Sequence, residues 1–211
     1  MFARRAVLMA ALLLALSVSA QQPPPAAAAQ TFTFNDPGSR DTVALMLDAP
    51  LEVINGLSNA LKGTVVVQGT KATGRLTVPV NTLKTGNETR DGHLQNDRWL
   101  DAAKHPDIIF EFKDIALPAA LEPGKPLKLQ TKGKFTIRGV TREEPVEVTA
   151  MLFKESAETK NRATGDLLRL RAKFRIPLEA YGIKRTEALL LKVGEVAEVT
   201  VDAWGSTQFK L

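Results

Sequence analysis

The chain has 211 residues, which is enough for one well-buried domain and too few for two full ones. Its 28 lysines and arginines exceed its 23 aspartates and glutamates only slightly and are spread evenly, so composition argues against a nucleic-acid partner. The chain contains no cysteine, which excludes a disulfide framework and means that stability must come from an apolar core.

The N-terminus has the pattern of a secretory signal peptide over residues 1–20. Arg4 and Arg5 precede an apolar run at residues 6–16, and small residues lead to Ala20, where a signal peptidase would cut. The apolar run is shorter than the ~20 residues that a helix needs to span a bilayer. We therefore expect cleavage and no stable membrane anchor.

The next segment, residues 21–30, is rich in Gln, Pro and Ala, and this composition predicts a disordered leader. The folded domain is then expected over residues 31–211. Because a cleaved signal peptide directs export, we expect the mature protein in the periplasm or outside the cell.

Alternation of apolar and polar residues dominates the folded part. Leu168, Leu170 and Phe174 fall on one face of a predicted strand, whereas Arg169 and Arg171 fall on the other. The segments that show this strand pattern are, in chain order, residues 41–47, 61–69, 74–80, 107–115, 127–139, 146–152, 168–178 and 197–205.

This succession of strands predicts an all-β fold. Turn-forming residues separate the strands, and no alternation of strands with helices is present. Since each strand has one charged face, the apolar faces must all meet inside. The arrangement favours an extended antiparallel eight-stranded β-barrel, whose interior can be filled by side chains or can hold one slim ligand.

One segment between two strands breaks the alternation. The Thr-x-x-Glu spacing from Thr85 predicts a short helix that begins near Gly86. Residues 96–104 predict a second helix, capped by Asn96 or Asp97. The barrel is therefore expected to carry a short helical insertion.

The same segment holds both histidines of the chain, His93 and His105, among several carboxylates. The pattern lacks a third histidine and an HExxH sequence, so a metalloenzyme at this cluster is the weaker interpretation. We expect no catalytic residue, no metal and no cofactor. Arg90, Asp91 and His93 are instead expected to have a structural role, as polar ties that hold the helical insertion over the barrel end.

Three stretches resemble signatures of the YceI-like family. They are "VPVNTLKTGNETRDGHLQNDRWLDAAKHPDIIFEF" at residues 78–112, "GKFTIRGVTREEPVEV" at 133–148 and "FRIPLEAYGI" at 174–183. The third departs from the family pattern, since residues 177–179 read Pro-Leu-Glu where an arginine is usual. The resemblance implies a lipocalin-like barrel, exported to the periplasm, that holds a polyisoprenoid or another long-chain lipid.

A lipid of this kind would enter past the helical insertion and lie against inward-facing side chains. The residues expected to bind it are Leu94, Trp99, Leu100, Ile108, Phe110, Phe112, Phe135, Ile137, Leu170, Phe174 and Val199. The expected role is transport, storage or sequestration of the lipid. The alternative is a barrel with a filled core that serves as a structural or interaction module, and either form is compatible with a homodimer.

Overall fold

The computed structural model describes residues 28–211, so the predicted signal peptide and most of the predicted leader lie outside the described residues. The strands are β1 (Gln30–Phe34), β2 (Thr42–Asp48), β3 (Val53–Ser58), β4 (Lys62–Gln68), β5 (Lys71–Pro79), β6 (Asp107–Ala116), β7 (Pro126–Ile137), β8 (Val140–Phe153), β9 (Leu167–Pro177) and β10 (Val196–Ser206). The helices are η1 (Val80–Thr82), α1 (Glu88–Gln95), α2 (Ala157–Lys160), η2 (Leu178–Tyr181) and η3 (Glu187–Leu189).

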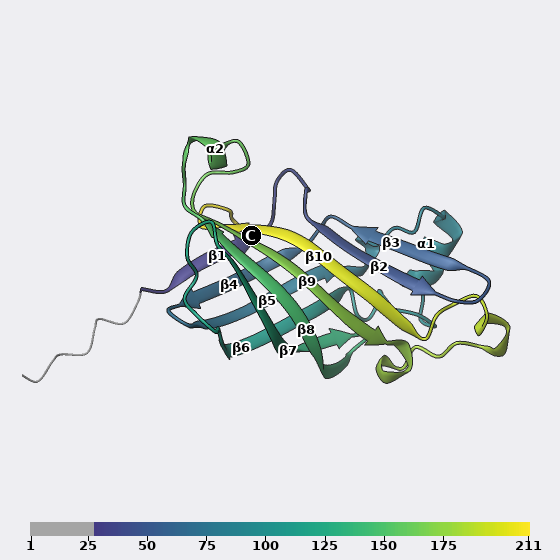
Figure 1. The fold of residues 1–211 in the computed structure, drawn as a ribbon. Coiled ribbons are helices and arrows are strands. Elements are labelled where there is room, and N and C mark those ends of the chain that lie inside the picture. The colour runs from purple at the N-terminus through teal and green to yellow at the C-terminus, as the bar shows by residue number, and fades with distance from the viewer. Residues whose placement is uncertain (1–27) are drawn as a thin grey trace, which may run out of the picture.

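Eight of the strands close into an antiparallel barrel, which confirms the predicted fold. The ring runs β1-β4-β5-β6-β7-β8-β9-β10 and closes where Thr33 and Phe34 of β1 pair with Ser206 and Gly205 of β10. Figure 1 shows an elongated barrel with α2 near one end and α1 at the other.

The β2–β3 hairpin lies beside this ring. One edge of β10 pairs with two strands. Its residues Ala197 to Asp202 pair with β2, and Gly205 and Ser206 pair with β1. The segment predicted at residues 41–47 is thus a strand next to the ring, and β1 takes its expected place within the ring. Neither β1 nor β3 was predicted, because β1 is short and Gly56 interrupts the pattern of β3.

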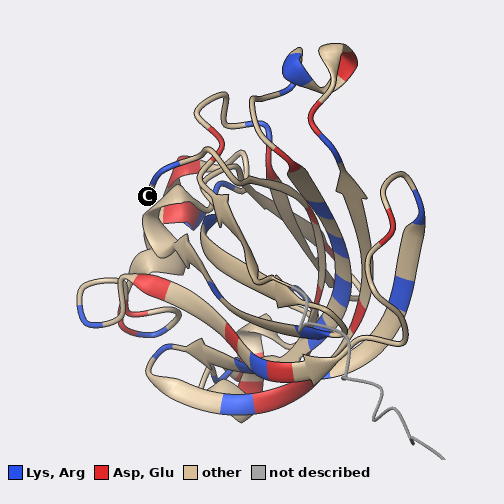
Figure 2. Cartoon of the chain, turned by 90° about the vertical axis from the view of Figure 1, so that its left-hand side faces the viewer, with Lys and Arg blue, Asp and Glu red and all other residues tan. Residues whose placement is uncertain are grey.

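The predicted alternation of faces holds in the long strands. In β9, Leu170, Ala172 and Phe174 point into the barrel, whereas Arg171 and Lys173 are exposed outside. Figure 2 shows the charged residues as separate bands along the strands, with uncharged residues between them. Apart from Thr131 and the indole of Trp99, the residues that line the inside of the barrel are aliphatic or Phe.

The most buried side chains lie towards the two ends of the barrel. Phe32 and Phe34 of β1 are 0% exposed near one end, and Val80 and Tyr181 are 1% and 0% exposed near the other. Side chains in the middle of the inward rows, such as Leu170, are only half-buried. The barrel is therefore packed at its ends and hollow in its middle.

The helical insertion is shorter than predicted. Helix α1 starts close to the expected position, with Asn87 as its N-cap and the Asn87 Oδ1 accepting the backbone N–H of Arg90. The predicted second helix at residues 96–104 is wrong, because these residues form turns. Asp101 adopts a left-handed conformation (φ 49°), which ends helical propagation, and its N–H donates to the carbonyl of Asn96 at 2.8 Å.

Candidate functional site

An apolar cavity of about 210 Å³ lies inside the barrel. A single water needs only ~10–15 Å³ by the same kind of measure, so the cavity is large enough for a sizeable ligand. All eleven residues singled out in the sequence line it, and they come from β6, β7, β9, β10 and the α1 segment: Leu94, Trp99, Leu100, Ile108, Phe110, Phe112, Phe135, Ile137, Leu170, Phe174 and Val199.

The lining contains almost no group that could bind a polar atom. Apart from the indole of Trp99, Thr131 of β7 is the one lining residue whose side chain carries a hydrogen-bonding atom, and the remaining residues are aliphatic or Phe. Among residues 28–211, no charged side chain lines the cavity. These lining side chains can remove hydrocarbon from water.

A row of four phenylalanines crosses the barrel wall from β6 to β9. Ring centroids are 5.4 Å apart for Phe112 and Phe110, 4.6 Å for Phe110 and Phe135, and 4.6 Å for Phe135 and Phe174. Such tilted aromatic pairs add ~0.5–1.5 kcal/mol each beyond the area that they bury. The four rings form one continuous side of the cavity. The alternation in the sequence predicts that each ring points inward, but it does not predict that the rings contact one another.

Two glycines allow these rings to lie close to the wall. A Cβ at Gly133 of β7 would overlap Cε2 of Phe110, and a Cβ at Gly74 of β5 would come within 2.6 Å of Cζ of Phe112. Neither role was predicted from the sequence, although a glycine inside a strand often marks a close approach of another group. By accepting the rings, the two glycines leave more of the interior free.

The α1 end of the barrel is tied down by polar contacts. Both the N–H and the Oγ1 of Thr85 donate to Oδ1 of Asp91 at 2.7 Å, and these hydrogen bonds hold the pKa of Asp91 below its ordinary value. Arg90 Nη1 lies 2.9 Å from Oε1 of Glu52, which joins α1 to the β2–β3 hairpin. These contacts fix the segment that carries Leu94 into the cavity.

The two histidines do not form a site. His93 is exposed, and its side chain makes no hydrogen bond or ion pair with the residues that the structure describes. His105 packs beside Gly139 in the β7–β8 turn. Within residues 28–211, no three metal-ligating side chains gather in one place.

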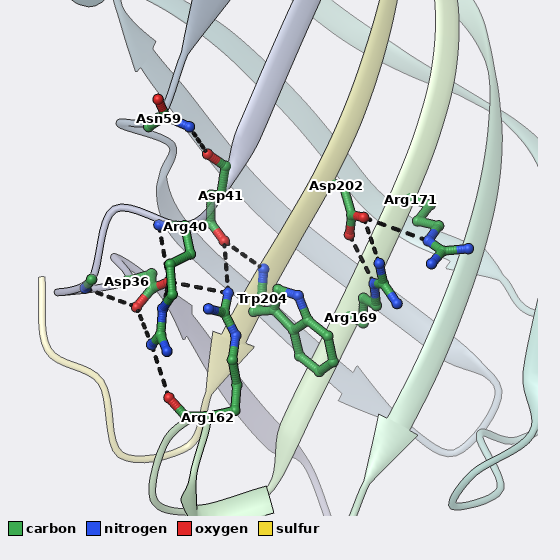
Figure 3. Close-up of polar contacts among 10 residues, drawn as sticks. Asp36, Arg40, Asp41, Asn59, Arg162, Arg169, Arg171, Asp202 and Trp204 are labelled. Atoms are coloured by element: carbon green, nitrogen blue, oxygen red, sulfur yellow. Dashed lines mark hydrogen bonds and ion pairs between the residues drawn. The ribbon is translucent and has the colours of Figure 1, made fainter.

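A polar cluster outside the cavity links the β1–β2 connection to β10 and to the β8–β9 connection (Figure 3). Asp36 accepts hydrogen bonds from Arg40 Nε at 2.9 Å and Nη2 at 2.8 Å, and Arg162 of the β8–β9 connection lies 3.1 Å from it. Asp41 Oδ1 accepts the backbone N–H of Trp204 at 2.9 Å. The cluster unites residues far apart in sequence, so no local motif indicated it.

The two acids of this cluster are shifted in opposite directions. Burial raises the pKa of Asp41 to about 6, although the hydrogen bond from Trp204 opposes that shift. Burial also acts on Asp36, but hydrogen bonds from Arg40 and Gly38 and the charge of Arg162 outweigh it and lower its pKa. The cluster is a structural clamp at the point where β1 and β2 separate along β10.

No helix within residues 28–211 has the length and apolar character needed to cross a membrane. A model of the YceI-like domain matches residues 37–204 of the chain. A search of curated proteins finds no match.

Solved structures share the fold at low sequence identity. A polyisoprenoid-binding domain from Saccharophagus degradans, implicated in plant cell wall breakdown, is 12% identical with a TM-score of 0.63, covering 85% of this chain and 99% of its own. Burkholderia cenocepacia BcnA is 15% identical with a TM-score of 0.56, covering 79% and 96%. The Campylobacter jejuni YCEI protein is 18% identical with a TM-score of 0.57, covering 72% and 83%.

Proposed function

Because this chain belongs to the YceI-like family, we propose that it binds a long-chain amphiphilic lipid of the polyisoprenoid or isoprenoid-quinone type inside its barrel. The observation that carries the proposal is the cavity, whose lining offers hydrocarbon contact from every side and no charged group. The description of the Saccharophagus degradans domain as polyisoprenoid-binding supports the choice of ligand class.

The energetics favour a long chain over a small ligand. Each buried methylene contributes ~0.8 kcal/mol, whereas association costs about 4–15 kcal/mol in lost translational and rotational freedom. A short apolar molecule would barely offset that cost in a cavity with so few hydrogen-bonding groups. A chain of about twenty carbons would contribute on the order of 16 kcal/mol and bind without a polar anchor.

The alternative hypothesis, a barrel with a filled core that binds no lipid, is the weaker one. A filled barrel would bury the middle of its inward rows as completely as its ends, yet Val148, Leu170 and Phe174 remain half-buried around the cavity. We extend the proposal to transport, storage or sequestration of the lipid in the periplasm, which the signal-like residues 1–20 favour.

A substitution that fills the cavity tests the proposal without burying a charge. Ala172 lies in the cavity lining, between Val148 of β8 and Val201 of β10 in the register, so Ala172→Trp places an indole in the ligand's path. Ala44 of β2 lies outside the lining, and Ala44→Trp is the matched control.

The measurement is displacement of a fluorescent fatty-chain probe by alcohols and quinones of increasing chain length. We expect affinity to rise with chain length in the wild type and in Ala44→Trp, and to fall at least about tenfold in Ala172→Trp. Affinity that is independent of chain length, or equal in the two variants, would contradict the proposal.

A further inference from the structure

The barrel wall has a seam between β6 and β7. These strands have 10 and 12 residues, yet only Ile109, Phe110 and Glu111 pair with Thr136, Phe135 and Lys134. By contrast, β7 pairs with β8 along its whole length, from Pro126 to Ile137. Beyond Glu111 the two strands lack a common ladder, although they are neighbours in the ring (Figure 1).

A β-bulge in β6 explains the seam. The register with β5 shifts between Ala72 and Gly74, and Asp114 there has a left-handed conformation (φ 50°). The N–H of Asp114 donates to Oγ1 of Thr73 at 2.9 Å, which fixes the bulge to β5. A bulge bends its strand, so β6 follows β5 and leaves β7.

The cavity reaches this seam. Phe112 and Ile115 of β6, Leu129 and Thr131 of β7, and Leu121 of the connection between them all line the cavity. All five side chains are only half-buried, as are Leu94 and Trp99 of the α1 segment, whereas Leu83 and Leu100 there are buried. The cavity lining is therefore accessible at the seam as well as near the helical insertion, past which the sequence predicts that a lipid enters.

The outer rim of the seam is basic. Lys113 of β6 and Lys128, Lys132 and Lys134 of β7 are all exposed. Lys113 and Lys132 each lie two residues beyond the last paired positions, Glu111 and Lys134, one on each side of the seam. Within residues 28–211, Lys113, Lys128 and Lys134 have no carboxylate within 4.0 Å, and Lys132 has only Glu143 at 3.8 Å.

Two acids near the rim are already engaged, whereas Glu147 of β8, which lies opposite Gln130, has no ion pair within residues 28–211. Glu111 forms an ion pair with Arg75, and Asp114 is held by its hydrogen bonds with Thr73. Thr131, the one hydroxyl of the cavity lining, lies in the stretch of β7 between Lys128 and Lys132. The seam thus combines an apolar interior, a hydroxyl at the boundary and positive charge outside.

We propose that the seam between β6 and β7 is the mouth of the cavity and binds an anionic head group, a carboxylate or a phosphate. The hydrocarbon chain lies in the cavity, the head group accepts a hydrogen bond from Thr131, and the rim lysines supply the countercharge. This inference rests on the proposed function and adds the chemical class of the ligand's head.

Ligands with one chain and different heads test the head-group preference. The probes are hexadecyl phosphate, palmitate, hexadecanol and hexadecyltrimethylammonium, titrated below micelle formation at low salt. We expect both anions to bind about tenfold or more tightly than the alcohol, with the cation weakest, and the advantage to shrink as salt screens the rim. A preference for phosphate or palmitate distinguishes the two anionic heads.

A triple variant tests whether the lysines at the seam cause the preference for anionic head groups. Lys113→Gln/Lys128→Gln/Lys132→Gln should lower affinity for the anions about tenfold and leave hexadecanol binding unchanged. The control is Lys62→Gln/Lys173→Gln/Lys192→Gln, which removes the same charge from exposed sites on β4, on β9 and in the loop before β10. Equal losses in both variants would overturn the assignment.

The outcomes separate the two proposals. If the alcohol and the anions bind with equal affinity, the anionic head group is wrong while the lipid-binding function stands. If no sixteen-carbon probe binds, the proposed function itself fails.

Crosslinking tests the entrance, because the chain contains no native cysteine. In Lys113→Cys/Lys132→Cys, a short bismaleimide verified by mass should slow hexadecanol association at least tenfold relative to the unlinked form. Lys128→Cys/Thr149→Cys joins paired positions of β7 and β8 and should show no change. If hexadecanol associates at the same rate when the seam is crosslinked, the seam is not the entrance to the cavity.

Discussion

The ring of Phe110 on β6 lies directly over Gly133 on β7, at the last stretch where these two strands run together. A Cβ at residue 133 would overlap the ring, so the glycine sets how far Phe110 extends into the barrel. Phe110 in turn packs against Phe135 and Phe112, and the position of one glycine therefore affects the whole aromatic row.

Gly133→Ala should push Phe110 towards the cavity. Overpacking of this kind costs about 1–3 kcal/mol, so we expect the free energy of unfolding in urea to fall by that amount. The displaced ring should also weaken binding of long-chain lipids. Gly92→Ala is the control, because apart from its chain neighbours and its own helix backbone nothing lies within 4 Å of the new Cβ, and alanine favours the helix by up to ~1 kcal/mol. Unchanged stability in Gly133→Ala would contradict this role.

The stability of the protein should depend on pH through Asp41. Its folded-state pKa of about 6 lies above the ordinary value of 3.8, so the folded state retains a proton that the unfolded state has lost. Stability due to this group therefore falls as pH rises from about 4 to about 6 and stays lower above that range. In Asp41→Asn, urea unfolding should show a gain on the order of 2–3 kcal/mol above pH 6 and none below pH 4.

Asp36→Asn is the matched control and should have the opposite sign. The pKa of Asp36 is lowered, so its ionised form stabilises the fold above the ordinary Asp pKa, and this contribution is lost as pH falls. The variant should be less stable than wild type at neutral pH and approach it in acid. If both substitutions shift stability in one direction, the account of the cluster is wrong.

The α1 segment should depend on Asp91 and not on His93. Asp91→Ala removes the acceptor of both Thr85 hydrogen bonds and should lower the melting temperature. His93→Ala removes an exposed side chain and should change the free energy of unfolding by less than about 0.5 kcal/mol. Calorimetry of both variants checks the contrast, and a large loss of stability in His93→Ala would support the structural role that the sequence predicts for the histidine and contradict this expectation.

The fold could be predicted because alternation is a local property of the sequence. Each of the long strands carries its own inward and outward faces, so Phe110, Phe135 and Leu170 were assigned to the cavity wall without knowledge of their neighbours. The second helix was mispredicted because the propensity of residues 96–104 is outweighed by hydrogen bonds back to α1. Leu100 N–H, for example, donates to the carbonyl of Leu94 at 3.1 Å.

The seam between β6 and β7 and the polar clamp around Asp36 and Asp41 could not be predicted, because both depend on contacts between distant segments. The seam arises from Asp114 bonding to Thr73, 41 residues away, and the clamp joins Asp41 to Trp204, 163 residues away. A bulge and a buried carboxylate leave no periodic signal. Lys113 and Lys132 read as ordinary outward positions until the strands around them are placed.

Native mass spectrometry of the protein purified from its host tests most directly whether the barrel holds a lipid chain. We predict one long-chain amphiphile per protein chain in the wild type and in Ala44→Trp, identified after organic extraction, and its loss in Ala172→Trp. A wild-type protein that carries no lipid and takes none up from added polyisoprenoids would contradict the claim.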